Sequence, residues 1–159
     1  MRICLDTNVY CRPFDDQSQK KIQEETDAFE EILEATKEGK LFLLSSDILV
    51  YEVSNILSFN IKTEVVKYLS LCKNRVEEGK DIKDLAIVIR DRCSIKDRDA
   101  LHLASAIIGK ADYFLTCDNK ITARKGVKCV EKISEEYGNK IRILSPVNFE
   151  YKRRKYDRS

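Results

Sequence analysis

The sequence predicts an α/β fold in which a mainly parallel central sheet is flanked by helices. Three observations favour this fold: short apolar runs that suit strands covered on both faces, stretches of helical periodicity between those runs, and no hairpin turn signals joining them. With 159 residues the chain fits one compact domain, which we expect over residues 1–150, followed by a basic tail over residues 151–159.

The N-terminal half is predicted to contain two strands, over residues 2–6 and 41–45, because each is a short apolar run bounded by polar residues. Between them, residues 18–38 carry apolar side chains at helical spacing, and a glycine follows as a stop. After the second strand, a serine and an aspartate can each cap a helix over residues 46–57. A further helical pattern lies near residues 63–78.

The C-terminal half continues the alternation of helices and strands. A helix is expected near residues 82–93, and a second one over residues 98–109 is apolar on nearly every side, which is typical of a helix surrounded by protein. The third strand covers residues 113–117 and is again closed by an acid. A charged helical stretch through residues 127–137 leads to the last strand, over residues 140–145.

Composition and cysteine usage indicate a cytoplasmic protein that does not contact a membrane. No apolar run approaches the ~20 residues that a membrane helix needs, and the opening residues lack the apolar stretch of a secretory signal. The cysteines form no C-x-x-C pair, so the sequence predicts neither a zinc site nor a disulfide. All six are expected to be small core residues in a reducing compartment: Cys4, Cys11, Cys72, Cys93, Cys117 and Cys129.

Four acids occupy positions where a surface acid is not expected. Asp6 and Asp118 follow apolar strands, Glu52 lies at the margin of a helical apolar stripe, and Asp99 opens the apolar central helix. In open parallel sheets, ligands bind outside the carboxyl ends of the strands, which is where the first two acids are placed. Each acid alone is explained as a cap, a turn former or an ion-pair partner.

Taken together, the four acids predict a site for a hard divalent cation. Two like charges ~5 Å apart repel by about 3 kcal/mol at an effective dielectric constant near 20, so clustered carboxylates need protons or cations. The strand ends carry no arginine or lysine. Oxygen ligands without a cysteine or histidine pair favour Mg²⁺ or Mn²⁺ over zinc.

The motifs around these acids resemble those of the PIN-domain ribonucleases, the family that contains the VapC toxins of toxin–antitoxin pairs. The resemblance consists of LDTN at residues 5–8, Glu52 within SSDILVYEVSNIL, DALHLASAI at residues 99–107 and FLTCD at residues 114–118. It covers most of the chain, and all four acids fall in the family's order. It implies a three-layer α/β/α fold and metal-dependent hydrolysis of RNA.

The resemblance also implies roles for individual residues. The catalytic, metal-binding acids would be Asp6, Glu52, Asp99 and Asp118, with Thr7, Asn8 and Thr116 hydrogen-bonded around them. Metal-assisted hydrolysis should leave a 5′-phosphate and a 3′-hydroxyl. The family further implies a homodimer and, for the toxin branch, a cognate antitoxin.

Basic residues are candidates for RNA contact. Arg12 lies beside Asp6, although an ion pair with Asp15 or Asp16 is the alternative. The tail could contact phosphates, or it could be a solvated terminus. Its candidate residues are Lys152, Arg153, Arg154 and Lys155.

Several alternatives remain open at this stage. Asp97 competes with Asp99 for the metal-facing position, although the residues that follow match the family better with Asp99. Asp99, His102 and Ser105 lie at successive i+3 positions, but side chains of one helix point the same way and do not converge into a catalytic triad. His102 is therefore expected to be a helix residue that packs near the sheet.

Two other function classes also fit parts of the sequence. A noncatalytic RNA-binding protein could keep the same fold and hold RNA through its tail. A phosphoacceptor signalling domain also places acids at strand ends, but it needs an acidic pair after the first strand, where this chain has Thr7 and Asn8.

Overall fold

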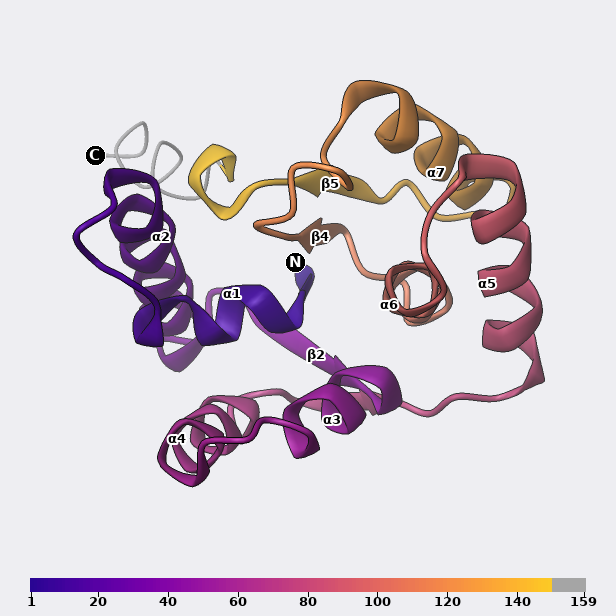
Figure 1. Cartoon of the computed structure of the whole chain (residues 1–159). Helices are drawn as coiled ribbons and strands as arrows, with labels where there is room; N and C mark the ends of the chain where they lie inside the picture. Colours follow the sequence, from indigo (N-terminus) through magenta and orange to yellow (C-terminus); the bar gives the residue numbers. More distant parts are fainter. Residues whose placement is uncertain (150–159) are drawn as a thin grey trace.

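The structure, a computed structural model, describes residues 1–149 and contains one five-stranded sheet (Figure 1). Every adjacent pair of strands is parallel, and the strand order is β3-β2-β1-β4-β5. The strands are β1 (Arg2–Leu5), β2 (Phe42–Ser46), β3 (Asn74–Val76), β4 (Tyr113–Leu115) and β5 (Arg142–Leu144). The predicted parallel α/β fold is therefore confirmed.

The strand order reverses at β1. The chain builds outward from β1 through β2 to β3, and then crosses to the other side of β1 to add β4 and β5. Such a reversal opens a crevice at the carboxyl ends of the strands on either side of it. These are the ends of β1 and β4, where Asp6 and Asp118 follow.

In residues 1–149, seven α-helices and one short 3₁₀-helix lie between the strands, and a second 3₁₀-helix follows the last strand. The α-helices are α1 (Thr7–Cys11), α2 (Lys20–Lys37), α3 (Asp47–Ser54), α4 (Phe59–Leu69), α5 (Lys80–Cys93), α6 (Asp97–Ile108) and α7 (Arg124–Glu136). The 3₁₀-helices are η1 (Arg12–Phe14) and η2 (Pro146–Asn148). Among these described helices, none is both long enough and apolar enough to cross a bilayer.

The helices cover both faces of the sheet, which gives three layers (Figure 1). Alternate residues of β1 divide between the two cores: Cys4 packs with α5, α6 and α7, whereas Ile3 and Leu5 pack with α1 to α4. Neighbouring strands follow the same alternation, with Leu44 in the first core and Leu43 in the second. This pattern explains why the strands read as continuous apolar runs.

The central helix α6 is buried as predicted, and its end lies against the edge of the sheet. A Cβ atom placed on Gly109 would lie 2.7 Å from Cγ2 of Val76 and 3.0 Å from the carbonyl oxygen of Ser105. Only a residue without a side chain allows this approach between α6 and β3.

Two elements differ from the sequence predictions. The helix expected near residues 63–78 ends at Leu69, and the chain then forms the edge strand β3, which pairs with β2 through Leu44 and Asn74. Cys72 and Val76 continue the helical spacing by coincidence. The helix α1 directly after Asp6 was not predicted, because five residues are too few to establish a helical period.

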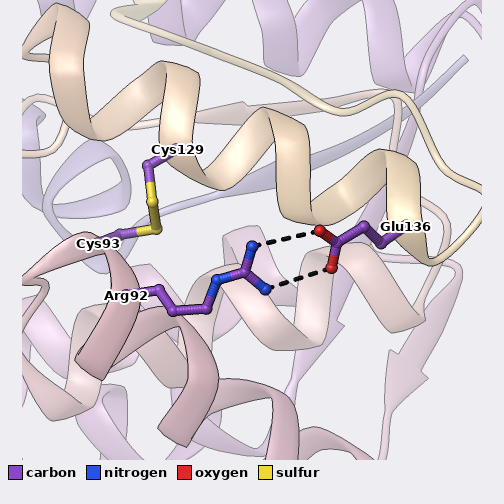
Figure 2. Close-up of a disulfide and its surroundings, with 4 residues drawn as sticks. All are labelled: Arg92, Cys93, Cys129 and Glu136. Atoms are coloured by element: carbon purple, nitrogen blue, oxygen red, sulfur yellow. Dashed lines mark hydrogen bonds and ion pairs between the residues drawn. A yellow bond between two sulfur atoms is a disulfide. The ribbon is translucent and has the colours of Figure 1, made fainter.

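The prediction that no disulfide forms is wrong. Cys93 at the end of α5 and Cys129 in α7 form a disulfide with their Cα atoms 5.7 Å apart, beside an ion pair between Arg92 and Glu136 that joins the same two helices (Figure 2). The partners are 36 residues apart in sequence, so local spacing gives no sign of the pairing. The other four cysteines are free thiols: Cys4, Cys11, Cys72 and Cys117.

Candidate metal centre

The candidate centre lies at the carboxyl ends of the two central strands. Asp6 follows β1, and its backbone N–H donates a hydrogen bond of 2.9 Å to the carbonyl oxygen of Leu115 at the end of β4. This bond extends the parallel pairing past the last strand residue. It therefore fixes the loop carrying Thr116 and Asp118 beside Asp6.

The Asp6 carboxylate is buried and held by three hydrogen bonds. Oδ1 accepts from the backbone N–H of Thr7 at 2.8 Å, and Oδ2 accepts from the Thr116 hydroxyl at 2.7 Å and from Nδ2 of Asn8 at 3.2 Å. Burial raises the pKa of Asp6, while the charge of His102 and the Thr116 hydrogen bond act in the opposite direction. Thr7, Asn8 and Thr116, which were predicted to hydrogen-bond around the acids, all donate hydrogen bonds to Asp6.

Asn8 also ties the two strand ends together. Its Oδ1 accepts a hydrogen bond of 3.0 Å from the backbone N–H of Cys117, and its Nδ2 lies 3.3 Å from the Thr116 hydroxyl. The side chain therefore bridges α1 to the loop after β4. Glycine at position 8 could not make this link, because it has no side chain.

Glu52 reaches Asp6 from α3. Its Oε1 accepts a hydrogen bond of 2.6 Å from the Thr7 hydroxyl and a short hydrogen bond from Nε2 of His102, and the same His102 nitrogen lies 3.7 Å from Oδ1 of Asp6. Ligating atoms of Asp6, Glu52 and His102 all lie within 4.8 Å of one another. Far-apart segments of the chain thus place two carboxylates and an imidazole in one cluster.

The imidazole of His102 and the carboxylate of Glu52 shift each other's pKa. Burial disfavours the charged form of His102, but the hydrogen bond with Glu52 and the charge of Asp6 outweigh burial and raise the His102 pKa. For Glu52, partial burial raises the pKa, but the hydrogen bonds from His102 and Thr7 outweigh it and hold the Glu52 pKa below its usual value. The two side chains therefore form a hydrogen-bonded pair within the cluster, in which each favours the charged form of the other.

Asp99 projects from the first turn of α6 toward the same cluster. Burial raises its pKa to about 6, and the nearby charges of Asp6 and Asp118 add to this effect. Asp99 and Asp118 line a cavity of about 250 Å³ together with Lys96 and Lys120. The fourth acid, Asp118, is oriented by the backbone N–H of Lys120, which donates to its Oδ1 at 2.8 Å.

Asp97, the competitor of Asp99, points away from the cluster. Its side chain is 75 % exposed and forms an ion pair of 3.2 Å with Arg90 of α5. Two residues along a helix correspond to a rotation of roughly 200°, so only one of the two acids can face the sheet. Asp99 is the one that does.

The remaining candidate residues are Arg12, which is held in ion pairs, and residues outside the described part of the chain. Arg12 forms ion pairs with Asp15 at 2.9 Å and with the buried Glu25 at 3.1 Å. The pair with Asp15 is one of the two that were expected as an alternative to RNA contact. The candidates in the basic tail lie outside the described residues: Lys152, Arg153, Arg154 and Lys155.

His102 is the one residue of the cluster that sequence reasoning did not assign to the site. It was expected to pack near the sheet, and it does contact the ring of Phe114 in β4, but its Nε2 faces Glu52 and Asp6 and not Ser105. The signal was present in the sequence, because a residue three positions after Asp99 lies on the same helical face.

Chemically, the arrangement combines concentrated negative charge with oxygen donors. Asp6, Glu52, Asp99 and Asp118 supply carboxylate oxygens, and the single nitrogen donor, His102, is already bonded to Glu52. A hard cation such as Mg²⁺ or Mn²⁺ fits this donor set better than Zn²⁺. Burial, followed by the nearby charges of Asp6 and Asp118, raises the pKa of Asp99, so a cation bound beside it would favour its charged form.

Comparisons with known proteins agree with this geometry. A family model described as PIN domain matches residues 3–127. A chain in the crystal structure of VapBC2 from Rickettsia felis, bound to a DNA fragment from their promoter, superposes with a TM-score of 0.54 at 18% sequence identity, covering 77% of this chain and 92% of that chain. A comparison with curated protein sequences finds no match. The family match extends over most of the chain, and the protein therefore belongs to the PIN domain family, as its motifs predicted.

Proposed function

We propose that this protein is a metal-dependent endoribonuclease that hydrolyses RNA phosphodiester bonds. The observation that carries the proposal is the cluster of Asp6, Glu52 and His102 at the carboxyl end of the sheet. Asp99 lies near enough to interact with the charges of Asp6 and Asp118. Membership of the PIN domain family supports the same reaction, and the motifs around the acids resemble those of the family's ribonucleases.

The four acids would hold Mg²⁺ or Mn²⁺. A bound cation of this kind supplies a Lewis acid for a phosphoryl oxygen and lowers the pKa of a bound water. Thr116 and Asn8 fix both the position and the orientation of the Asp6 carboxylate, and Thr7 does the same for Glu52. These hydrogen bonds keep the carboxylates close together although they repel one another.

His102 supports the site through Glu52. Its hydrogen bond to Oε1 orients the Glu52 carboxylate, whose other oxygen, Oε2, lies 3.9 Å from Nη1 of Arg98. Lys96 and Lys120 line the cavity beside Asp99 and Asp118, where they would attract the phosphates that flank the reacting bond.

A cleavage assay tests this function. Purified protein is incubated with end-labelled single-stranded RNA in Mg²⁺, in Mn²⁺ and in excess EDTA, and the product ends are identified. We expect cleavage only with metal, products with 5′-phosphate and 3′-hydroxyl ends, and loss of cleavage in Asp6→Asn. Asp97→Asn is the matched control, because its carboxylate points away from the cluster. Metal-independent cleavage, or full activity in folded Asp6→Asn, would contradict the proposal.

We further propose that the protein acts as the toxin of a two-protein pair and forms a homodimer. The support is the fold shared with a chain of VapBC2, which is described in complex with promoter DNA. Co-expression with a protein encoded by the adjacent gene, followed by co-purification and an RNA cleavage assay, tests the pairing. Sedimentation of the purified protein tests the dimer. A monomer would remove the dimer, and cleavage that no neighbouring gene product suppresses would remove the toxin role; neither result would remove the nuclease activity.

A further inference from the structure

A second cavity borders the acidic cluster on the side of α3. It has a volume of about 350 Å³ and lies at the junction of α3, α6 and the segment after β3. Its lining residues are Asp47, Ile48, Tyr51, Glu78, Arg98 and Leu101. The volume is in the range of small-ligand sites, and neither the acids nor their hydrogen-bonding partners occupy it.

Arg98 connects this cavity to the cluster. Its Nη1 lies 3.9 Å from Oε2 of Glu52, which is the oxygen not bonded to Thr7 or His102, and its guanidinium carbon lies 5.5 Å from the centre of the Tyr51 ring. One cation thus contacts both the acidic cluster and an aromatic ring. A guanidinium at this position can bind a phosphate group held at the cluster.

Tyr51 presents a free aromatic surface beside that cation. The residue is 53% exposed although it directly precedes the partly buried Glu52, and among the described residues its hydroxyl makes no hydrogen bond. An exposed aromatic side chain next to arginine is the arrangement that stacks nucleic-acid bases in single-stranded binding sites.

The charge of the cavity favours a base over a phosphate. The Asp47 carboxylate accepts hydrogen bonds from Nε of Arg75 at 2.6 Å and from the backbone N–H of Glu78 at 2.8 Å. Glu78 is the second acidic residue of the cavity lining. Carboxylates repel phosphate but accept hydrogen bonds from the amino groups of bases. Within the cavity lining, positive charge is confined to Arg98, at the edge facing Glu52.

We propose that Tyr51 and Arg98 form a subsite for one unpaired base of the substrate, adjacent to the phosphate at the acidic cluster. The base stacks on the Tyr51 ring, and Arg98 contacts its phosphate. This inference rests on the proposed nuclease function and adds a requirement: the nucleotide beside the cleaved bond must be unstacked, since a base within a duplex cannot reach the ring.

The test compares Tyr51→Ala with wild-type protein on fluorescein-labelled single-stranded RNA. The Kd is measured by fluorescence anisotropy in Mg²⁺, and KM and kcat are measured from cleavage. Loss of one base stack is worth about 5- to 150-fold in affinity, so Kd and KM should rise by that factor, with the loss in KM and not in kcat. Tyr51→Phe keeps the ring and should restore wild-type Kd. Tyr137→Ala removes a similarly exposed ring at the end of α7 and is the matched control.

A set of RNAs with one abasic nucleotide at each position identifies the base. In wild-type protein, one abasic position next to the cleavage site should raise Kd about as much as Tyr51→Ala does, and in Tyr51→Ala that position should have no further effect. Additive losses, or a Kd of Tyr51→Ala within twofold of wild type, would overturn the subsite. Failure of wild-type protein to bind single-stranded RNA would also overturn it. Binding without cleavage would instead refute the nuclease function, and the Kd pattern would still decide the subsite.

Discussion

Replacing Asp99 with asparagine should stabilise the metal-free protein. Asp99 has a pKa raised from its ordinary value of 3.8 to about 6 by burial and by the neighbouring Asp6 and Asp118, so its ionised form is unfavourable in the folded state. Asparagine has nearly the same shape without the charge. Because no hydrogen bond to the Asp99 carboxylate is found in the described chain, the substitution mainly removes repulsion.

The size of the effect follows from the pKa. A shift of about two units corresponds to roughly 3 kcal/mol at 1.36 kcal/mol per unit. Since the Asp99 side chain is only half-buried, solvent screens part of this energy, and we expect Asp99→Asn to raise the free energy of unfolding by about 1–2 kcal/mol. An acid in the first turn also interacts favourably with the helix dipole, and its loss costs about 0.3–1 kcal/mol.

The sign of the pH dependence is fixed by the same shift. Between pH 3.8 and about 6 the folded protein binds the Asp99 proton more tightly than the unfolded chain, so the contribution of Asp99 to stability falls as pH rises through this interval. The gain in Asp99→Asn should therefore be complete above about pH 6 and vanish below about pH 4.

Urea denaturation in EDTA at pH 7.5 and pH 4 measures this difference. Asp97→Asn is the matched control, because Asp97 lies in the same first turn and loses the same dipole interaction, but its side chain is 75% exposed and paired with Arg90. Apart from the lost interaction with the helix dipole, we expect Asp97→Asn to change the free energy of unfolding by less than about 0.5 kcal/mol. The reasoning is refuted if Asp99→Asn is no more stable than Asp97→Asn at pH 7.5.

Three further variants test one hydrogen bond at the site, the disulfide and the packing of α6. Thr116→Val removes the 2.7 Å hydrogen bond to Asp6 and should lower the free energy of unfolding by about 1.5–3 kcal/mol in urea; an unchanged denaturation midpoint would contradict a bond to a charged group. Replacing Cys93 and Cys129 with serine should lower the free energy of unfolding by about 2–4 kcal/mol, because the disulfide no longer restricts the unfolded chain. The double variant should also show no effect of dithiothreitol on its melting temperature. Equal melting temperatures of the wild-type protein with and without reductant would speak against the disulfide. Gly109→Ala should destabilise by about 1–3 kcal/mol, since the added Cβ would lie 2.7 Å from a neighbouring methyl group; a neutral effect would show that α6 can move away from β3.

The fold and most of the acidic cluster could be predicted because their signals are local. Asp6 and Asp118 are acids directly after buried strands, and parallel strands bring such ends to one edge of the sheet. The disulfide between Cys93 and Cys129 could not be predicted, since it exists only where α5 packs against α7. The edge strand β3 was missed because none of its three residues is fully buried, so it has no apolar alternation.

His102 shows a different limit of sequence reasoning. Its position on the Asp99 face of α6 follows from helical spacing, but its partner Glu52 is 50 residues away and belongs to another helix. A single histidine on an apolar helix is usually a packing residue, and only the packing of α3 against α6 decides which atoms its ring meets. The orientations of Asp97 and Asp99 similarly depend on the rotation of α6 relative to the sheet.

Mn²⁺ binding measured by electron paramagnetic resonance tests the central claim most directly, because the signal of free Mn²⁺ falls as the ion is bound and no substrate is needed. We expect saturable binding to the wild-type protein that Mg²⁺ displaces, at least tenfold weaker binding in Asp6→Asn and Asp99→Asn, and unchanged binding in Asp97→Asn. Equal Mn²⁺ affinity in all four proteins would contradict a metal centre built from Asp6, Glu52, Asp99 and Asp118.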